Sequence, residues 1–224
     1  MPPIFYIFAM KRSGQHAIIN WLCEANQPAL HFNRCTQVKE KIEYKGITDY
    51  HHKKRNSNIC DFNLYNLIVY NFEEQLIFKI KPKYITPIVI VREPKNLIAS
   101  RIKVGISKFN NIMWINHMNS GYYTIFFDEW FSNENYRIKI MNDLQLNFNE
   151  KGLNQVYNSG KSSFDKFKYD GKAQQMDVLN RWKGMRSEIS KNYTPSYSQL
   201  WDQYYPKNIG KHKPIIRETK NRWF

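Results

Sequence analysis

The residues best suited to chemistry stand between two apolar stretches, where Lys11, Arg12, Ser13 and Gly14 follow one another. A turn with a small hydroxyl residue and a glycine lets backbone N–H groups converge on a phosphate at the positive end of a helix. The two cations add favourable charge beside that turn. The pattern therefore predicts a site that binds a phosphate group.

This loop does not match the signature of loops that bind Mg-ATP. That signature, GxxxxGK[ST], requires an earlier glycine and a lysine directly after the second glycine. Here Gly14 is followed by Gln15 and His16. The loop therefore favours a phosphate over a magnesium nucleotide. An ordinary strand-to-helix turn with Ser13 as the helix N-cap is the alternative interpretation.

A second anion-binding pattern lies in residues 86–103. Residues 88–91 are typical of a buried parallel strand, Arg92 follows them, and Pro94 suits the first turn of a helix. An arginine at a strand end can offer a two-pronged fork to a phosphate. Ser100, eight residues further on, adds a hydroxyl if the turn folds back over the ligand. These residues predict a second phosphate contact.

The two motifs together resemble those of the sulfotransferases that use 3'-phosphoadenosine 5'-phosphosulfate (PAPS), in particular the small bacterial and phage-type members. The first loop of that family reads [PK]-[RK]-S-G-[TS]-x, and residues 11–16 are similar to it. The second motif reads R-[DNE]-P-x-[DN]-x-x-x-S, and residues 92–100 match each of its fixed positions. Gln15 and His16 replace the threonines that are common after the first-loop glycine. The resemblance covers most of the chain, densely only at these two motifs.

The resemblance implies which residues bind PAPS and its product, adenosine 3',5'-bisphosphate (PAP). In the family the first loop binds the 5'-phosphosulfate and the second motif holds the 3'-phosphate. Arg217 stands in for a basic loop that closes over the nucleotide in cytosolic members and that this sequence does not clearly contain. The implied set is Lys11, Arg12, Ser13, Gly14, Gln15, His16, Ala17, Arg92, Ser100 and Arg217.

The implied reaction moves a sulfuryl group from PAPS to a hydroxyl or amine acceptor, with a glycan as the preferred class, and needs no metal. Lys11 or Arg12 would stabilise the leaving phosphate, and the sequence does not distinguish between them. Glu73 is the candidate general base, because it directly follows a predicted strand at the edge where both motifs converge. The alternative bases are Glu74, His31, His51 and His52.

The elements that must position these residues alternate between strands and helices. We expect them in the order strand 4–9, helix 14–25, strand 28–33, polar loop 36–60, strands 64–72 and 86–91, helix 94–104 and helical segments to about 190. Residues 172–190 have the periodicity of one amphipathic helix. The order predicts an α/β, P-loop-like three-layer fold in one domain over residues 1–224, with a central parallel sheet flanked by helices. Ligands of such sheets bind at the carboxyl ends of the strands, where both motifs lie.

Composition limits the remaining classes of protein. The 224 residues carry a net charge of +15, which attracts polyanions. The basic residues are spread along the chain without a nucleic-acid-binding motif, so nucleic acid is not the expected partner. Three cysteines without a CxxC pair favour reduced thiols, no metal site and a cytoplasmic location. The longest apolar run is well short of the roughly 20 residues that a membrane span needs.

Two other functions stay open. A P-loop-type kinase shares the topology, but it requires a metal and a loop lysine that this sequence does not have. A non-catalytic polyanion-binding protein on the same fold would explain the net charge and would bind with a steep salt dependence.

Overall fold

The computed structural model describes residues 2–38, 41–50, 54–55, 61–75, 85–106, 111–155, 172–191, 193 and 195–208. His51, His52 and Arg217, which the sequence proposes as site residues, lie outside these ranges. Within them, no helix is long and apolar enough to cross a membrane.

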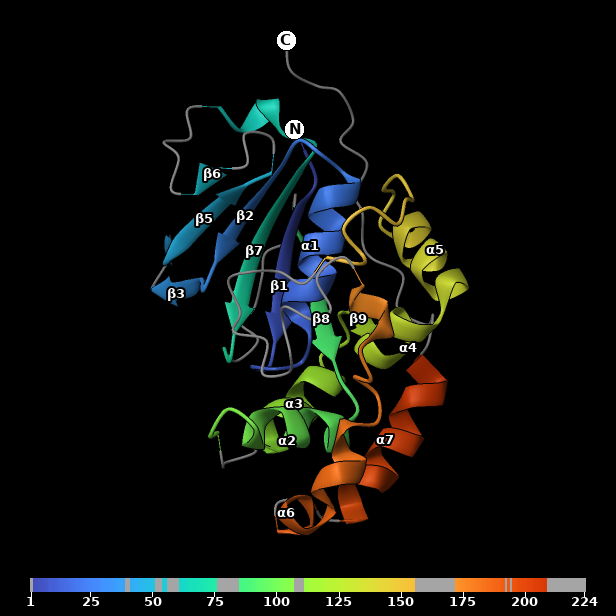
Figure 1. Ribbon diagram of the computed structural model, residues 1–224. Helices are drawn as coiled ribbons and strands as arrows, with labels where there is room; N and C mark the ends of the chain where they lie inside the picture. The colour runs from blue at the N-terminus through green and yellow to red at the C-terminus, as the bar shows by residue number, and fades with distance from the viewer. Residues whose placement is uncertain are drawn as a thin grey trace.

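A sheet of seven strands forms the centre of the described part of the chain (Figure 1). In spatial order its strands are β6 (Lys54–Arg55), β5 (Gly46–Asp49), β2 (Ala29–Asn33), β7 (Leu67–Glu73), β1 (Ile4–Ala9), β8 (Ile85–Val91) and β9 (Tyr123–Phe126). β2, β7, β1, β8 and β9 run parallel to one another, whereas β5 and β6 extend the sheet in antiparallel pairing. Parallel strands are buried on both faces, which explains their apolar runs. The predicted P-loop-like α/β class with a central parallel sheet flanked by helices is confirmed.

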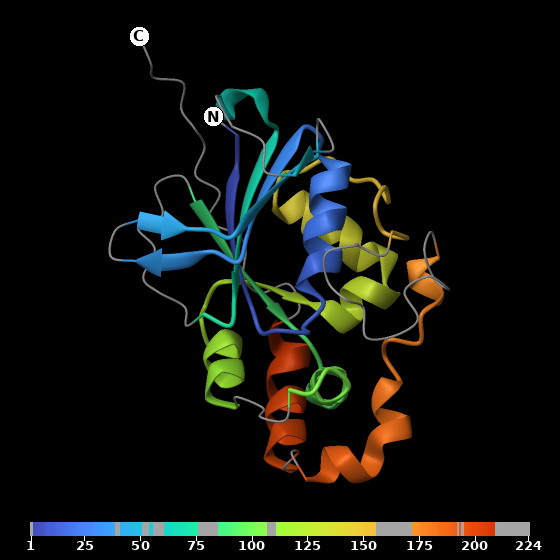
Figure 2. The ribbon, with the colours of Figure 1, turned by 60° about the vertical axis from the view of Figure 1, so that its left-hand side comes forward.

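Helices cover the sheet and the ends of its strands. Their bounds are α1 (Gln15–Ala25), α2 (Pro94–Ile102), α3 (Asn111–Met118), α4 (Phe127–Ser132), α5 (Glu134–Asp143), α6 (Arg186–Ser190) and α7 (Pro195–Asn208). Figure 2 shows α1, α4 and α5 on one side of the sheet and α3 on the other. The carboxyl ends of β1, β7 and β8 point toward α2, α3 and α7 (Figure 1).

The two faces of the central strands carry different side chains. Phe8 stacks on Phe72 and Phe32 stacks on Tyr70, with ring centroids 5.1 and 4.5 Å apart. Side chains alternate between the faces of a strand, so the opposite face receives the residues between these aromatics. Glu73, which follows Phe72, also lies on this opposite face, which α1 covers, within reach of α1 side chains.

Residues 36–60 contain strands where the sequence predicted a polar loop. A two-stranded sheet pairs β3 (Thr36–Val38) with β4 (Lys41–Glu43), and β5 and β6 follow at the sheet edge. The prediction was wrong because edge strands need little apolar surface. Native proteins place charged residues on such strands to prevent pairing with other chains, and polar composition then resembles that of a loop.

The second half of the chain also differs from the predicted run of helices. β9 lies within it, and α7 extends beyond the predicted limit near residue 190. Residues 172–190 form 3-10 turns at Ala173–Gln175 and Arg181–Met185 followed by α6, so the single amphipathic helix is wrong. The reason is that the apolar residues of this segment bury against separate surfaces. Val178 joins the main core, while Ile189 packs in a second cluster with residues of α2.

Candidate functional site

The loop between β1 and α1 has a backbone shape that suits an anion. Gly14 is the N-cap of α1 with φ 89°, and Arg12 has φ 76°. Ser13 donates its backbone N–H to Met10 O at 3.0 Å, and Ala17 donates to Gly14 O at 3.0 Å. The first N–H groups of a helix have no partner within the helix, so those at the start of α1 are donors for a ligand. Ser13 as N-cap is wrong, because Gly14 occupies that position.

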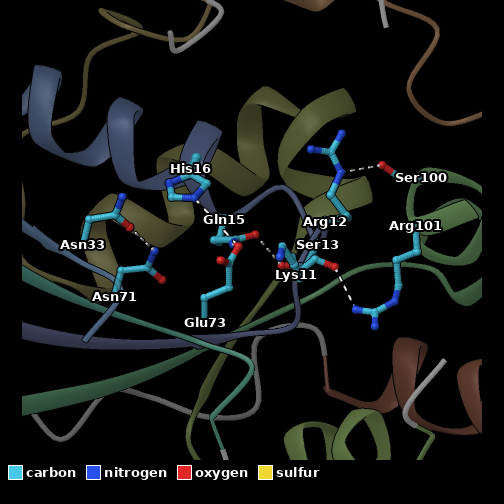
Figure 3. Close-up of polar contacts among 10 residues, drawn as sticks. All are labelled: Lys11, Arg12, Ser13, Gln15, His16, Asn33, Asn71, Glu73, Ser100 and Arg101. Atoms are coloured by element: carbon cyan, nitrogen blue, oxygen red, sulfur yellow. Dashed lines mark hydrogen bonds and ion pairs between the residues drawn. The ribbon is translucent and has the colours of Figure 1, made fainter. Parts of the chain in front are cut away.

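Two arginines from other elements hold this loop from outside. Arg92, at the end of β8, donates from Nη1 to Arg12 O at 3.2 Å. Arg101, in α2, donates from Nη1 to Lys11 O at 3.3 Å (Figure 3) and forms an ion pair with Glu74. The guanidinium groups thus satisfy two carbonyl oxygens of the loop.

The two sequence motifs meet at this loop. Arg12 donates from Nε to Ser100 Oγ at 3.3 Å, although 88 positions separate the two residues (Figure 3). Ser100 is 1% exposed and faces the loop from the second turn of α2. The structure therefore brings together the hydroxyl and the guanidinium that the sequence assigned to two separate phosphate contacts.

Arg92 is the most deeply buried cation of the site. Its side chain lies over the Phe127 ring, 4.8 Å from the guanidinium carbon to the ring centroid, and Nη2 donates to Val178 O at 2.7 Å. Burial lowers the pKa of Arg92 to about 10, with Asp128 acting in the opposite direction. Among the described residues, Nε has no hydrogen-bond partner. The predicted fork is therefore partly engaged by backbone carbonyls, and Nε is one donor that remains for a ligand.

A pair of half-buried carboxylates fixes the start of α2 beside Arg92. Glu93 caps the helix by accepting from the N–H groups of Lys95 and Asn96 at 3.0 and 2.8 Å. Asp128 accepts from the N–H of Glu93 at 2.7 Å. Burial raises the pKa of both carboxyl groups. These contacts position Arg92 and Ser100 relative to one another.

Glu73 lies beside the loop, as its place at the end of β7 predicted. It pairs in register with Ala9, the last residue of β1, and accepts a hydrogen bond from Gln15 Nε2 at 2.6 Å (Figure 3). His16 Nε2 is 3.9 Å from the same carboxylate oxygen. Burial lowers the pKa of His16, an effect that Glu73 opposes and that Arg34 and Arg12 reinforce.

The surface next to Glu73 on this face is polar. Asn71 donates to Asn33 Oδ1 at 3.1 Å (Figure 3). The His31 ring lies 6.3 Å from the His16 ring. Burial lowers the pKa of His31 to about 3, so this imidazole is neutral at pH 7. Within the described ranges neither of its ring nitrogens has a hydrogen-bond partner. A neutral, hydrogen-bonding surface thus borders the carboxylate.

Sequence reasoning missed three residues of the site. Arg101 directly follows the second motif, and its position one residue after Ser100 was the available signal. Phe127 and Asp128 begin α4, far along the chain, and reach the site because β9 lies next to β8. No local pattern marks them.

Gly14 offers a test of how tightly the loop is packed. A Cβ at this position would lie 2.2 Å from the Phe127 ring, and the residue has positive φ. Gly14→Ala should therefore combine backbone strain of about 1–2 kcal/mol with an overpacking cost of about 1–3 kcal/mol. Gly105→Ala is the matched control, because Gly105 has φ +76° and nothing within 4 Å of its added Cβ.

Chemical denaturation of the two variants measures this difference. We expect Gly14→Ala to lose clearly more free energy of unfolding than Gly105→Ala, and Gly14→Ala/Phe127→Leu to recover part of it relative to Phe127→Leu alone. Equal losses in both alanine variants would contradict the close contact between Gly14 and Phe127.

A known protein resembles this chain in structure but not in sequence. No protein-family model matches this sequence, and no curated protein matches it. The chain is similar in structure to mouse sulfotransferase SULT7A1, solved as a crystal structure complexed with PAP, with a TM-score of 0.42 and 14% sequence identity. The alignment covers 92% of this chain and 84% of that one. This likeness assigns no ligand and no residue role.

Proposed function

We propose that this protein is a sulfotransferase that moves the sulfuryl group of PAPS to a hydroxyl or amine acceptor, with a glycan as the preferred class. The observation that carries the proposal is the meeting of two phosphate motifs at one edge of the sheet. Arg12 contacts Ser100 by hydrogen bond, and Arg92 holds the backbone of Arg12. A ligand with phosphate groups at two positions fits such a pair of motifs better than a ligand with one.

The donor groups of the site suit an anionic nucleotide. The N–H groups at the start of α1, the exposed Lys11 and the guanidinium of Arg12 all belong to the loop or to the helix that follows it. The buried Nε of Arg92 lacks a partner among the described residues and would contribute a charge-assisted hydrogen bond. We assign the 5'-phosphosulfate to the loop and the 3'-phosphate to Arg92 and Ser100. Bound PAPS supplies an activated sulfuryl group and leaves PAP behind after transfer.

The residues of the chain have separate tasks in this proposal. Glu73 accepts the proton of the acceptor hydroxyl or amine as the new bond to sulfur forms. Lys11 or Arg12, with the loop N–H groups, stabilises the negative charge that stays on the phosphate of PAP when the bond from its bridging oxygen to sulfur breaks. Burial lowers the pKa of Arg12, which Glu73 partly offsets, and its guanidinium is still a cation at pH 7.

Glu73 is our choice of base because of what surrounds the other candidates. The carboxylate of Glu74 forms an ion pair with Arg101. His31 is 1% exposed, and its ring lies 6.3 Å from that of His16. Glu73 contacts the start of α1 through Gln15 and His16, next to the loop to which we assign the phosphosulfate.

A thermal-shift panel of PAP, AMP, ADP and ATP tests the proposal without a known acceptor. PAP should raise the melting temperature clearly more than AMP at equal concentration, because AMP lacks the 3'-phosphate. Equal stabilisation by AMP and PAP would contradict the assignment of the 3'-phosphate.

Two further arms of the panel separate the other functions. Stabilisation by Mg-ATP without a response to PAP would favour a kinase. Binding of heparin or DNA with a steep salt dependence, and none of PAP, would favour a polyanion-binding protein.

A further inference from the structure

A chain of two hydrogen bonds connects the loop to Glu73. Gln15 Nε2 donates to Glu73 Oε1 at 2.6 Å, and Ser13 Oγ donates to Gln15 Oε1 at 3.0 Å (Figure 3). Ser13 and Gln15 are each 1% exposed. Hydrogen bonds in such a buried setting are electrostatically stronger than those in water. The carboxylate of Glu73 is therefore held by a side chain that belongs to the loop and helix start.

The chemistry of Glu73 and Ser13 decides which group donates and which accepts in these two hydrogen bonds. An ionised carboxylate only accepts hydrogen bonds, so the amide nitrogen of Gln15 must face Glu73. The amide oxygen then faces Ser13, whose hydroxyl must donate. Both ends of the Gln15 amide are thus engaged, and its contribution to anion binding would come from its backbone N–H at the start of α1.

We propose that Gln15 is the positioning residue of Glu73 and that Ser13 orients Gln15 in turn. The inference rests on the proposed function, in which Glu73 is the general base. A glutamate at a strand end has several accessible rotamers, and the bond from Gln15 selects one of them. The bond engages Oε1, so we assign Oε2 to the acceptor's proton. The same contact sets the distance from the base to the loop, and orientation of reacting groups contributes strongly to rates.

The titration of Glu73 tests this role directly. In protein carrying ¹³C-labelled glutamate carboxyl groups, NMR follows Glu73 through a pH series, with its signal assigned by its loss in Glu73→Gln. Gln15→Met keeps the length of the side chain and removes the donor to the charged carboxylate. The midpoint for Glu73 should move to higher pH, as expected for loss of a hydrogen bond that favours the charged form. Ser13→Ala should move it in the same direction by less.

A second glutamine that donates to a glutamate provides the matched control. Gln27 donates to Glu24 at the opposite end of α1. Gln27→Met should leave the Glu73 midpoint unchanged, because this half-buried amide bonds to another glutamate. A general effect of exchanging glutamine for methionine would not distinguish the two variants in this way. An unchanged Glu73 midpoint in Gln15→Met, or in Ser13→Ala if the first variant does not fold, would overturn the positioning role.

The PAP thermal shift separates this inference from the proposed function. Gln15→Met should keep the PAP response of the wild-type protein, because the backbone N–H groups of the loop stay in place. Loss of the PAP response in the variant alone would contradict the view that the Gln15 side chain serves Glu73. Absence of a PAP response in the wild-type protein would reject the proposed function, while the titration would still decide whether Gln15 holds Glu73.

Discussion

Glu73→Gln should lower sulfuryl transfer by roughly 10²- to 10⁴-fold, the range typical of a lost general base. The substitution keeps the shape of the side chain and removes its basicity. In the part of the chain that the structure describes, the carboxylate bonds to the side chain of Gln15 and lies near that of His16, and neither contact involves the loop backbone that would hold the nucleotide. PAP should therefore stabilise the variant about as well as the wild-type protein. Release of PAP from PAPS, with an acceptor that the wild-type protein uses, measures the effect.

Glu134→Gln is the matched control for this change. Glu134 is exposed in the first turn of α5, away from the described site, and the same carboxylate-to-amide exchange there should leave transfer unchanged. Suppose that Glu73→Gln transfers at the wild-type rate, whereas Glu74→Gln or His31→Ala loses transfer. The general base would then be Glu74 or His31, whichever variant loses it. Because Glu74 pairs with Arg101, which holds Lys11 O, a modest loss in Glu74→Gln alone is compatible with a supporting role.

Arg92→Ala should abolish most of the preference for PAP over AMP. Loss of a charge-assisted hydrogen bond costs about 1.5 to 3 kcal/mol, which corresponds to roughly tenfold to a hundredfold in PAP affinity. The variant should also melt at lower temperature, because Arg92 bonds to Arg12 O and Val178 O. Comparing PAP with AMP in the same variant removes this loss of stability from the measurement. Isothermal titration of both ligands supplies the ratio.

A second buried arginine controls for the cost of removing such a side chain. Arg137 is 4% exposed and donates to Trp130 O at 2.8 Å and to Glu150. Arg137→Ala should destabilise the protein to a similar degree and leave the ratio of PAP to AMP affinity unchanged. If Arg92→Ala keeps the wild-type ratio of PAP to AMP affinity, the assignment of the 3'-phosphate to Arg92 is wrong.

The strands and helices nearest the two motifs could be predicted because their signals are local. The apolar run of β1, the glycine after it and the periodicity of α1 are readable within about 20 residues, as are β8, Pro94 and α2. The position of Glu73 at the end of a buried strand was predicted in the same way. Parallel strands place their carboxyl ends at one edge, so the meeting of both motifs also followed from the sequence.

Contacts between distant segments depended on the tertiary structure. The order of β1, β8 and β9 in the sheet decides which loop carbonyls Arg92 and Arg101 bind. It also decides that Phe127 packs on Gly14. The strands of residues 36–60 were missed because edge strands can be as polar as loops.

The sequence by itself determined the chemistry that this protein can offer: two basic, hydroxyl-bearing turns at strand ends and a carboxylate at a third. Those properties reside in residue types and in short-range backbone preferences. Only the tertiary structure decided which donor faces which acceptor, as in the path from Ser13 through Gln15 to Glu73. Hydrogen bonds require distances near 3 Å and defined directions, and the packing of segments 58 residues apart sets both for Gln15 and Glu73.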